Sequence, residues 1–141
     1  MIKTVKVFEK GSSMADVLLE NTPQNVIAGG ENADLCVVMP GFCDSVYGEY
    51  KILLAPQNFE CKCKAGKVFS YGMERKSMVT LSSVGENRCI MTLQEEIENI
   101  WGKTIEPQDI VISRMHLEPD AALATAAALM IVGAEKFLCG I

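Results

Sequence analysis

Three short apolar runs, each closed by a turn-forming residue, constrain the fold of this chain most strongly. The runs span residues 35–39, 50–55 and 67–71, and proline or glycine follows each of them. Each run is continuous rather than alternating and is shorter than an ordinary helix, which is typical of a strand buried on both faces. Three such strands in series predict the centre of an α/β sheet.

An amphipathic strand and a short helix are expected before these runs. Residues 3–8 place Val5 and Val7 on one side of the chain, and this period of two predicts a half-buried strand. A serine hydroxyl accepts a hydrogen bond from a free amide at a helix start. We therefore expect one of the serines at positions 12–13 to cap a helix that runs to Glu20.

The second half of the chain predicts antiparallel structure. Residues 78–84 and 89–93 alternate around the turn sequence of residues 85–88, which is typical of a hairpin. Residues 105–113 are expected to form another strand. Because proline donates no hydrogen bond, Pro107 is expected at an edge or just before the paired segment.

Local rules disagree over residues 94–103. A capping box at residues 92–95 favours a helix that ends before Gly102. The segment from Trp101 to Thr104 fits the turn of a second hairpin equally well. Both alternatives stay open from the sequence.

An alanine-rich helix is expected to close the chain. Asp120 is a preferred N-cap, alanine and leucine favour helix, and Gly133 is placed to end it. Its apolar side chains lie all round the axis, so we expect it to be covered on most faces. Residues 57–66 are predicted to be a loop and the seam between the parallel and antiparallel parts.

These elements predict one domain over residues 1–141, the usual length of an ordinary domain. Its predicted fold class is α/β, with a short-stranded mixed sheet. Residues 1–60 form the parallel part. Residues 67–141 form an antiparallel hairpin region and the closing alanine-rich helix.

Composition excludes several classes of function. Eighteen acidic against thirteen basic side chains give a net charge of −5, which disfavours nucleic-acid binding. The longest uncharged run, residues 121–134, is shorter than the ~20 residues of a membrane span. The first residues lack the apolar core of an export signal. We therefore expect a cytoplasmic protein with no nucleic-acid or membrane partner, whose six cysteines are thiols.

The later part of the chain resembles a known family. Residues 67–72 read Lys-Val-Phe-Ser-Tyr-Gly, a hairpin-rich stretch follows, and His116 and Asp120 then precede an alanine-rich helix that ends at Gly133. Over residues 67–134 this order resembles the closing part of the central domain of Mur ligases, the ATP-dependent amide-forming enzymes of peptidoglycan synthesis. The resemblance places His116 on the histidine of the family's His-Asn-x-x-Asn-Ala motif and Asp120 on its second asparagine.

The catalytic equipment of that family is missing. A phosphate loop needs a glycine-rich segment that ends in Gly-Lys-Thr or Gly-Lys-Ser. The tripeptide at residues 102–104 lacks a glycine five positions before it. The motif's first asparagine is Leu117 here, and Pro119 is added. A relative of this kind would have lost ATP hydrolysis and ligation, so the resemblance implies a scaffold used for contact.

The pair Cys61 and Cys63 is the closest approach to a metal motif. Zinc sites usually have four ligands and more widely spaced cysteines, and His116 is the only histidine. We therefore expect no metal and no cofactor, and we interpret the pair as two thiols in an exposed loop.

Loop 41–50 is the strongest candidate for a binding segment. It carries three aromatic rings between glycines and follows the carboxyl end of a strand, where α/β folds place their sites. The alternative is a packed connection whose rings cover the edge of the core. The predicted ligand-binding residues are Phe42, Cys43, Asp44, Tyr47, Tyr50, His116 and Asp120.

The sequence favours a non-catalytic domain that acts by protein–protein contact, as a homo-oligomer or with a protein partner. One alternative is a small-ligand or nucleotide-binding protein that uses loop 41–50 and the region of His116. Another is a thiol-dependent enzyme in which Cys43 is the nucleophile.

Overall fold

The computed structural model describes residues 1–11 and 14–134. The helices of this part are α1 (Met14–Glu20) and α2 (Pro119–Ile131). The strands are β1 (Lys3–Phe8), β2 (Val26–Ala28), β3 (Leu35–Val38), β4 (Glu49–Pro56), β5 (Lys64–Tyr71), β6 (Val79–Val84), β7 (Arg88–Leu93), β8 (Ile97–Glu98), β9 (Thr104–Ile105) and β10 (Gln108–Ser113).

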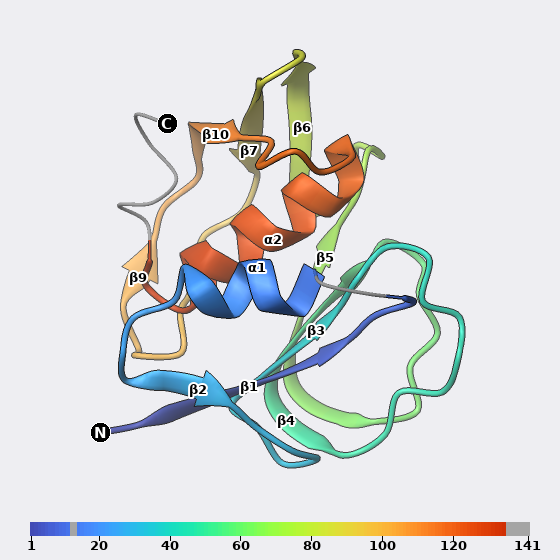
Figure 1. Cartoon of the computed structure of the whole chain (residues 1–141), viewed down its shortest axis with the longest axis vertical. Helices are drawn as coiled ribbons and strands as arrows, with labels where there is room; N and C mark the ends of the chain where they lie inside the picture. The colour runs from blue at the N-terminus through green and yellow to red at the C-terminus, as the bar shows by residue number, and fades with distance from the viewer. Residues whose placement is uncertain (12–13, 135–141) are drawn as a thin grey trace.

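A mixed eight-stranded sheet in the order β10-β7-β6-β5-β4-β3-β1-β2 is the framework of the molecule (Figure 1). All pairs from β2 to β6 are parallel, whereas β6–β7 and β7–β10 are antiparallel. β8 and β9 form a separate antiparallel pair. The predicted fold class, an α/β domain with a mixed sheet, a hairpin region and a closing alanine-rich helix, is confirmed.

The first three strands are joined without a long return. Val5 of β1 lies opposite Ala28 of β2 on one side and opposite Leu35 of β3 on the other. Along the strand direction, β2 therefore ends where β3 begins. The connecting residues 29–34 only have to cross β1 near its middle. This arrangement explains how a short loop can connect two parallel strands that normally require a long crossover.

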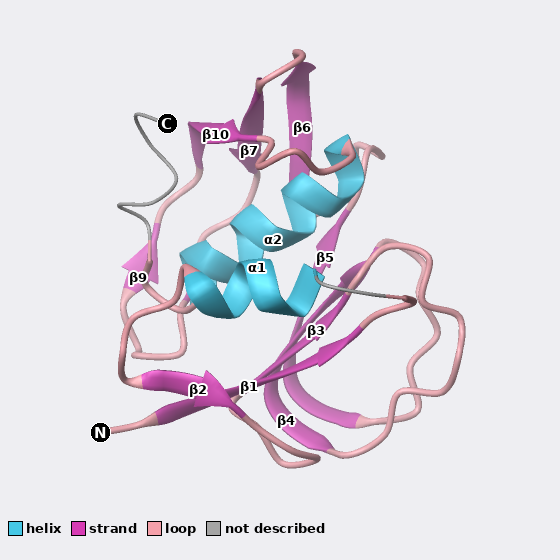
Figure 2. Cartoon of the chain, viewed as in Figure 1, coloured by secondary structure: helices cyan, strands magenta, loops and turns pink. Residues whose placement is uncertain are grey.

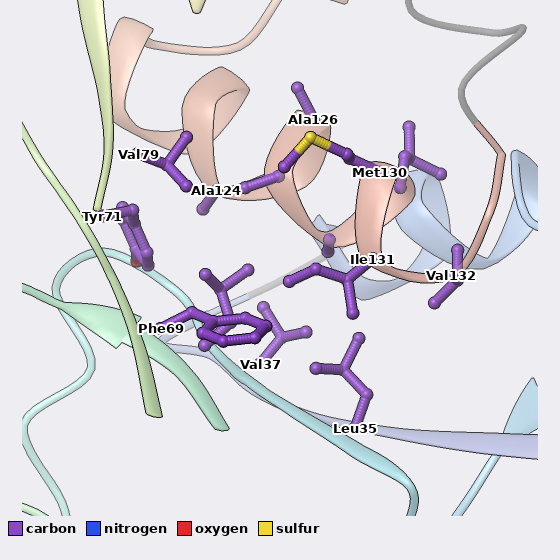
Figure 3. Packing of buried hydrophobic residues seen from close by; sticks show 14 of the residues in the cluster. Leu35, Val37, Phe69, Tyr71, Val79, Ala124, Ala126, Met130, Ile131 and Val132 are labelled. Atoms are coloured by element: carbon purple, nitrogen blue, oxygen red, sulfur yellow. The ribbon is translucent and has the colours of Figure 1, made fainter. Parts of the chain in front are cut away.

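Both helices cover one face of the sheet, and α1 lies beside α2 (Figures 1 and 2). Every side chain from Ala121 to Ile131 is buried, as predicted for a helix that is apolar all round. The core beneath this helix comes from alternate positions of the central strands. Figure 3 shows part of it, with Leu35, Val37, Phe69 and Tyr71 facing Ala124, Met130 and Ile131.

The opposite face of β1, β3 and β4 is covered by extended chain. Residues 39–48 and 57–63, drawn as loops in Figure 2, connect β3 to β4 and β4 to β5. No helix of the described residues lies in either connection. Side chains of these loops and of β5 close a second core with Cys36, Val38 and Leu53; they are Phe42, Phe59, Cys61, Cys63 and Ala65.

Most predicted strands are confirmed. The three continuous apolar runs are β3, β4 and β5 at the centre of the sheet. β3 is buried on both faces as predicted, whereas β5 is exposed on the face that carries Val68, so burial on both faces is wrong for β5. Residues 3–8 form β1. The hairpin of β6 and β7 is present, and Pro107 lies just before β10, which is an edge strand. The helix before Glu20 is present as α1, but its expected cap at residues 12–13 lies outside the described residues.

Two further local predictions are wrong. Asp120 is not the N-cap of α2, because Glu118 holds that position and Pro119, whose fixed φ suits a first helical turn, begins the helix. The Asp120 carboxylate instead accepts a hydrogen bond from the Ala121 amide at 2.8 Å. Of the predicted loop 57–66, residues 57–63 form a loop and residues 64–66 already belong to β5. The loop joins two parallel strands, so the change of strand direction lies at the β6–β7 hairpin.

Gly133 ends α2 as predicted. Its φ of +85° is left-handed, and its amide and that of Ala134 donate to carbonyls in the last turn of the helix. Neither helix of the described residues combines the length and apolar character that would be needed to cross a membrane.

Candidate functional site

A hollow of about 600 Å³ opens at the amino ends of the central strands. We call it the Trp101 pocket. Strands of the main sheet supply one wall, and the turn between β8 and β9 supplies the other. It is lined by Met1, Lys3, Asp34, Lys51, Ile52, Gly66, Lys67, Glu98, Asn99, Ile100, Trp101 and Gly102.

Strand order brings the charged residues of this pocket together. Lys3 begins β1, Asp34 directly precedes β3, and Lys51 and Lys67 lie in the first halves of β4 and β5. These four strands are neighbours in the sheet and run in the same direction. Their amino ends therefore meet at one edge.

Asp34 connects three of these strands. Its Oδ2 accepts hydrogen bonds from the Thr4 amide at 2.9 Å and the Thr4 hydroxyl at 3.3 Å. Its Oδ1 lies 3.2 Å from the Lys51 ammonium. Burial alone would raise the pKa of this carboxyl, but the Thr4 amide and the nearby Lys51 outweigh burial and lower the pKa below 3.8. Asp34 is therefore ionised at neutral pH.

The other wall is the hairpin of β8 and β9, so the hairpin alternative for residues 94–103 is the one observed. Asn99 holds its turn. The Asn99 side-chain oxygen accepts hydrogen bonds from the amides of Trp101 and Lys103, each at 2.9 Å. The backbone amide of Asn99 also donates a hydrogen bond to the Lys103 carbonyl at 2.9 Å. This buried asparagine presents Trp101 at the tip of the hairpin.

The hairpin is fastened to the end of α2. The Ile100 amide donates to the Ile131 carbonyl at 3.1 Å, and the Trp101 indole N–H donates to the Val132 carbonyl at 2.9 Å. The last carbonyls of a helix have no partner within the helix itself. The turn supplies donors for two of them, and this fixes the position of the indole ring beside the pocket.

Positive charge is in slight excess within the pocket. Lys51 is paired with Asp34, and the Lys67 ammonium lies 3.6 Å from Glu98. The side chains of Lys67 and Glu98 are 54% and 51% exposed. An ion pair so exposed contributes at most about 1 kcal/mol, so a ligand can exchange for it. The Lys3 ammonium lies 5.7 Å from the centre of the Trp101 ring, within the range of a cation–π interaction.

The predicted aromatic residues of loop 41–50 gather on Phe8. The Phe42 and Phe8 ring centres are 5.4 Å apart, and Tyr47 meets Phe8 edge-on at 5.6 Å. Tyr50 is buried, and its hydroxyl donates to the Tyr47 carbonyl at 2.6 Å. The rings thus form a packed connection over the second core, and Tyr47 remains 52% exposed.

The other predicted site residues are dispersed. Cys43 and Asp44 are exposed in loop 41–50. His116 and Asp120 are exposed at the start of α2, which covers the opposite face of the sheet. His116 itself has a left-handed backbone, with φ of 60°. As ligand-binding residues, these side chains and the rings of loop 41–50 stay predictions.

The signal for the Trp101 pocket was present in the sequence but was not used. Lys3, Lys51 and Lys67 each stand at the amino end of an apolar strand. Neighbouring parallel strands begin at the same edge of a sheet, so these lysines could have been expected together. The position of Trp101 depends on a hydrogen bond to a residue about thirty positions away in the sequence. Local sequence patterns do not predict such a contact.

No family model matches this chain, and no curated protein or solved structure matches it. The resemblance of residues 67–134 to Mur ligases therefore stays a prediction. Within residues 1–11 and 14–134, no three side chains of the histidine, cysteine or carboxylate type converge on a position that could hold a metal ion.

Proposed function

We propose that this protein is a non-catalytic binding domain and that its ligand is a small anion with a planar ring, bound in the Trp101 pocket. Pockets of about 300–1,000 Å³ are the usual size for small-molecule sites, and this one measures about 600 Å³. The single observation that carries the proposal is the placement of the chain's only tryptophan beside three lysines.

The charges in the pocket favour an anion. Lys3 lies over the Trp101 ring, and its charge also acts on the Asp34 carboxylate. Lys67 is paired with the exposed Glu98. We expect a carboxylate or phosphate group that binds here to replace Glu98 beside Lys67 and to leave the Asp34–Lys51 pair in place. Because the whole chain carries a net charge of −5, an anion would bind here through local lysines and not through the overall field.

The apolar lining favours a planar ring. Ile52, Ile100 and Trp101 lie beside the lysines. The indole is fixed at its nitrogen by the Val132 carbonyl, so its orientation is set before any ligand arrives. A fixed aromatic surface binds a flat partner at little conformational cost. Aromatic carboxylates and nucleotides both meet this description.

Titration of intrinsic fluorescence tests the proposal directly. Trp101 is the only tryptophan, so a change in indole emission reports on this pocket. A panel of aromatic carboxylates and nucleotides is added to the full chain, and thermal melting is recorded alongside. We expect at least one compound to give a saturable change in emission and to raise the melting midpoint, because a ligand that binds only the folded state stabilises it.

Matched variants identify the groups responsible. Lys67→Ala and Lys3→Ala are expected to weaken binding by about tenfold each, which corresponds to ~1.4 kcal/mol, the strength of a charge-assisted hydrogen bond. Lys76→Ala removes the same charge from an exposed turn outside the pocket and should leave affinity unchanged. If no compound alters emission or melting, or if all three variants behave alike, the proposed ligand class is wrong.

A second candidate function is self-association, and one observation favours it. β10 ends the sheet, so one side of this six-residue strand has no strand neighbour among the described residues. Val111 in this strand is 47% exposed. An exposed edge strand is a template for pairing with another chain, and we propose a second copy of this chain as the partner.

A further inference from the structure

Three cysteine side chains meet on the face of the sheet that the loops cover. Cys36 is fully buried on β3, and Cys61 and Cys63 pack against the same core from loop 57–63. Burial and, after it, the nearby sulfurs of Cys63 and Cys61 raise the pKa of Cys36 to about 12. The three sulfurs therefore share one small region, with Cys36 on β3 and the other two on loop 57–63.

The loop between β4 and β5 brings Cys61 and Cys63 side by side. Here the two Sγ atoms lie 2.6 Å apart, and the Cys63 amide points at the Cys61 Sγ at 3.3 Å. Both residues are partly exposed, so solvent and small molecules reach them, whereas Cys36 is sealed beneath.

We propose that Cys61 and Cys63 form a thiol–disulfide exchange site whose substrate is a low-molecular-weight disulfide of the glutathione type. The proposal is independent of the Trp101 pocket. Joining residues this close in sequence adds little constraint to the unfolded chain. The fold therefore does not depend on whether the bond is present, which suits a bond that is made and broken in the native protein.

The geometry assigns different roles to the two sulfurs. The Cys63 N–H points at the Cys61 Sγ, and we assign the first attack to Cys61. Burial and, after it, the contact with Cys61 raise the pKa of Cys63 to about 12. Cys63 therefore keeps its proton at neutral pH and acts in the second step.

The reaction takes two displacements. The Cys61 thiolate attacks one sulfur of the small disulfide; a mixed disulfide forms, the original S–S bond breaks, and the departing thiolate takes a proton from water. Cys63 then gives its proton to water and attacks the Cys61 sulfur, which displaces the second small thiolate, and that thiolate is protonated. Two protein thiols lose two electrons, and one small disulfide becomes two thiols.

Thiol trapping on the native full chain tests the proposal. A Cys43→Ser background removes an exposed competitor, and the protein is equilibrated in glutathione buffers from reducing to oxidising. Free thiols are alkylated after denaturation in acid, and the chain is cleaved after glutamate, which releases residues 61–74 with both cysteines in one peptide. We expect this peptide to change from two alkyl groups to none, with the loss of two hydrogen atoms.

Two variants test the order of the steps. Cys63→Ser should stop at the mixed disulfide and carry one glutathione on Cys61. Cys61→Ser should acquire no adduct under the same conditions, because burial, the main cause of the raised pKa of Cys63, remains in this variant. Circular dichroism of each sample confirms that the chain is folded when it reacts.

Several results would overturn the proposal. One is a peptide 61–74 that keeps both alkyl groups at every glutathione ratio. Another is a bond from either cysteine to Cys36 in place of the internal bond. Equal adducts on the two single variants would disprove the assigned roles. None of these results bears on fluorescence titration of the Trp101 pocket, so the two proposals fail separately.

Discussion

Gly133 both ends α2 and makes room for Trp101 beside the pocket. Its φ of +85° lies in the left-handed region, where a side chain is strained. A Cβ built at this position would lie 3.3 Å from the indole ring of Trp101. The same absence of a side chain thus permits α2 to end and the tryptophan to approach its last turn.

Replacing Gly133 should therefore destabilise the protein. Gly133→Ala is expected to lower the free energy of unfolding by about 1–2 kcal/mol, because alanine pays the cost of a left-handed backbone. Urea unfolding followed by circular dichroism measures the change. Gly30→Ala is the matched control, since its added Cβ meets no atom within 4 Å. Equal losses in the two variants would show that the backbone of Gly133 is not the cause.

At the scale of the elements, Asp34 determines how β1, β3 and β4 meet at their amino ends. The pKa of its carboxyl is lowered in the folded state, so the ionised form stabilises the fold. That stabilisation is fully present above the ordinary pKa of 3.8. It is lost as the pH falls through the lower pKa of the folded protein.

An acid titration of stability checks this contribution. Wild-type protein should lose stability as the pH falls below about 4, and Asp34→Asn should lack that part of the loss and be less stable at neutral pH. Thermal melting from neutral to acid pH gives both quantities. Asp44→Asn changes an exposed carboxyl and serves as the control. A melting curve for Asp34→Asn with the full wild-type acid dependence would contradict the assignment.

Sequence patterns predicted the elements whose causes are local. β3 was predictable from its own apolar run, which proline and glycine close. The hairpin of β6 and β7 was predictable from the alternation of apolar and polar residues within each strand. Residues 94–103 were undecided because the decisive interactions are distant: the turn donates to carbonyls at the end of α2. The predicted Asp120 cap is wrong because Pro119 begins the helix, with Glu118 as its N-cap two residues before Asp120.

The candidate site was less predictable than the fold. Residues 41–48 lie in a loop after the end of a strand as expected, but Tyr50 already belongs to β4. Phe42 and Tyr47 lie against Phe8, and Tyr50 is buried. The pocket lies at the other edge of the sheet, where lysines from β1, β4 and β5 converge. No local pattern reveals that convergence, because it depends on the order of strands in the finished sheet.

At the scale of the whole molecule, the two faces of the sheet are covered unequally. Both helices cover one face, and loops cover only β1, β3 and β4 on the other. Val68 of β5 and Val111 of β10 remain 58% and 47% exposed. This surface and the β10 edge are available to a second copy, as the self-association candidate requires.

Light scattering of two variants shows whether two copies associate through the β10 edge or through the exposed face of the sheet. We expect the wild-type chain to form dimers and Val111→Lys to be monomeric, because a charge on an edge strand opposes strand pairing. Val68→Lys changes a strand inside the sheet and should leave the dimers intact. A monomeric wild-type chain at high concentration would contradict self-association, and loss of dimers only in Val68→Lys would assign the contact to the face.

The connection between β4 and β5 has little spare length. Because Lys64 is aligned with Glu49, the chain must return from Pro56 over about 23 Å, at ~3.3 Å per residue of strand. Residues 57–63 reach about 29 Å when fully extended, and without two residues they would reach about 22 Å. Extra residues here would cost little loop entropy, whereas a two-residue deletion would force the register of the central pair to shift. Length variation in this segment is therefore tolerated in one direction only.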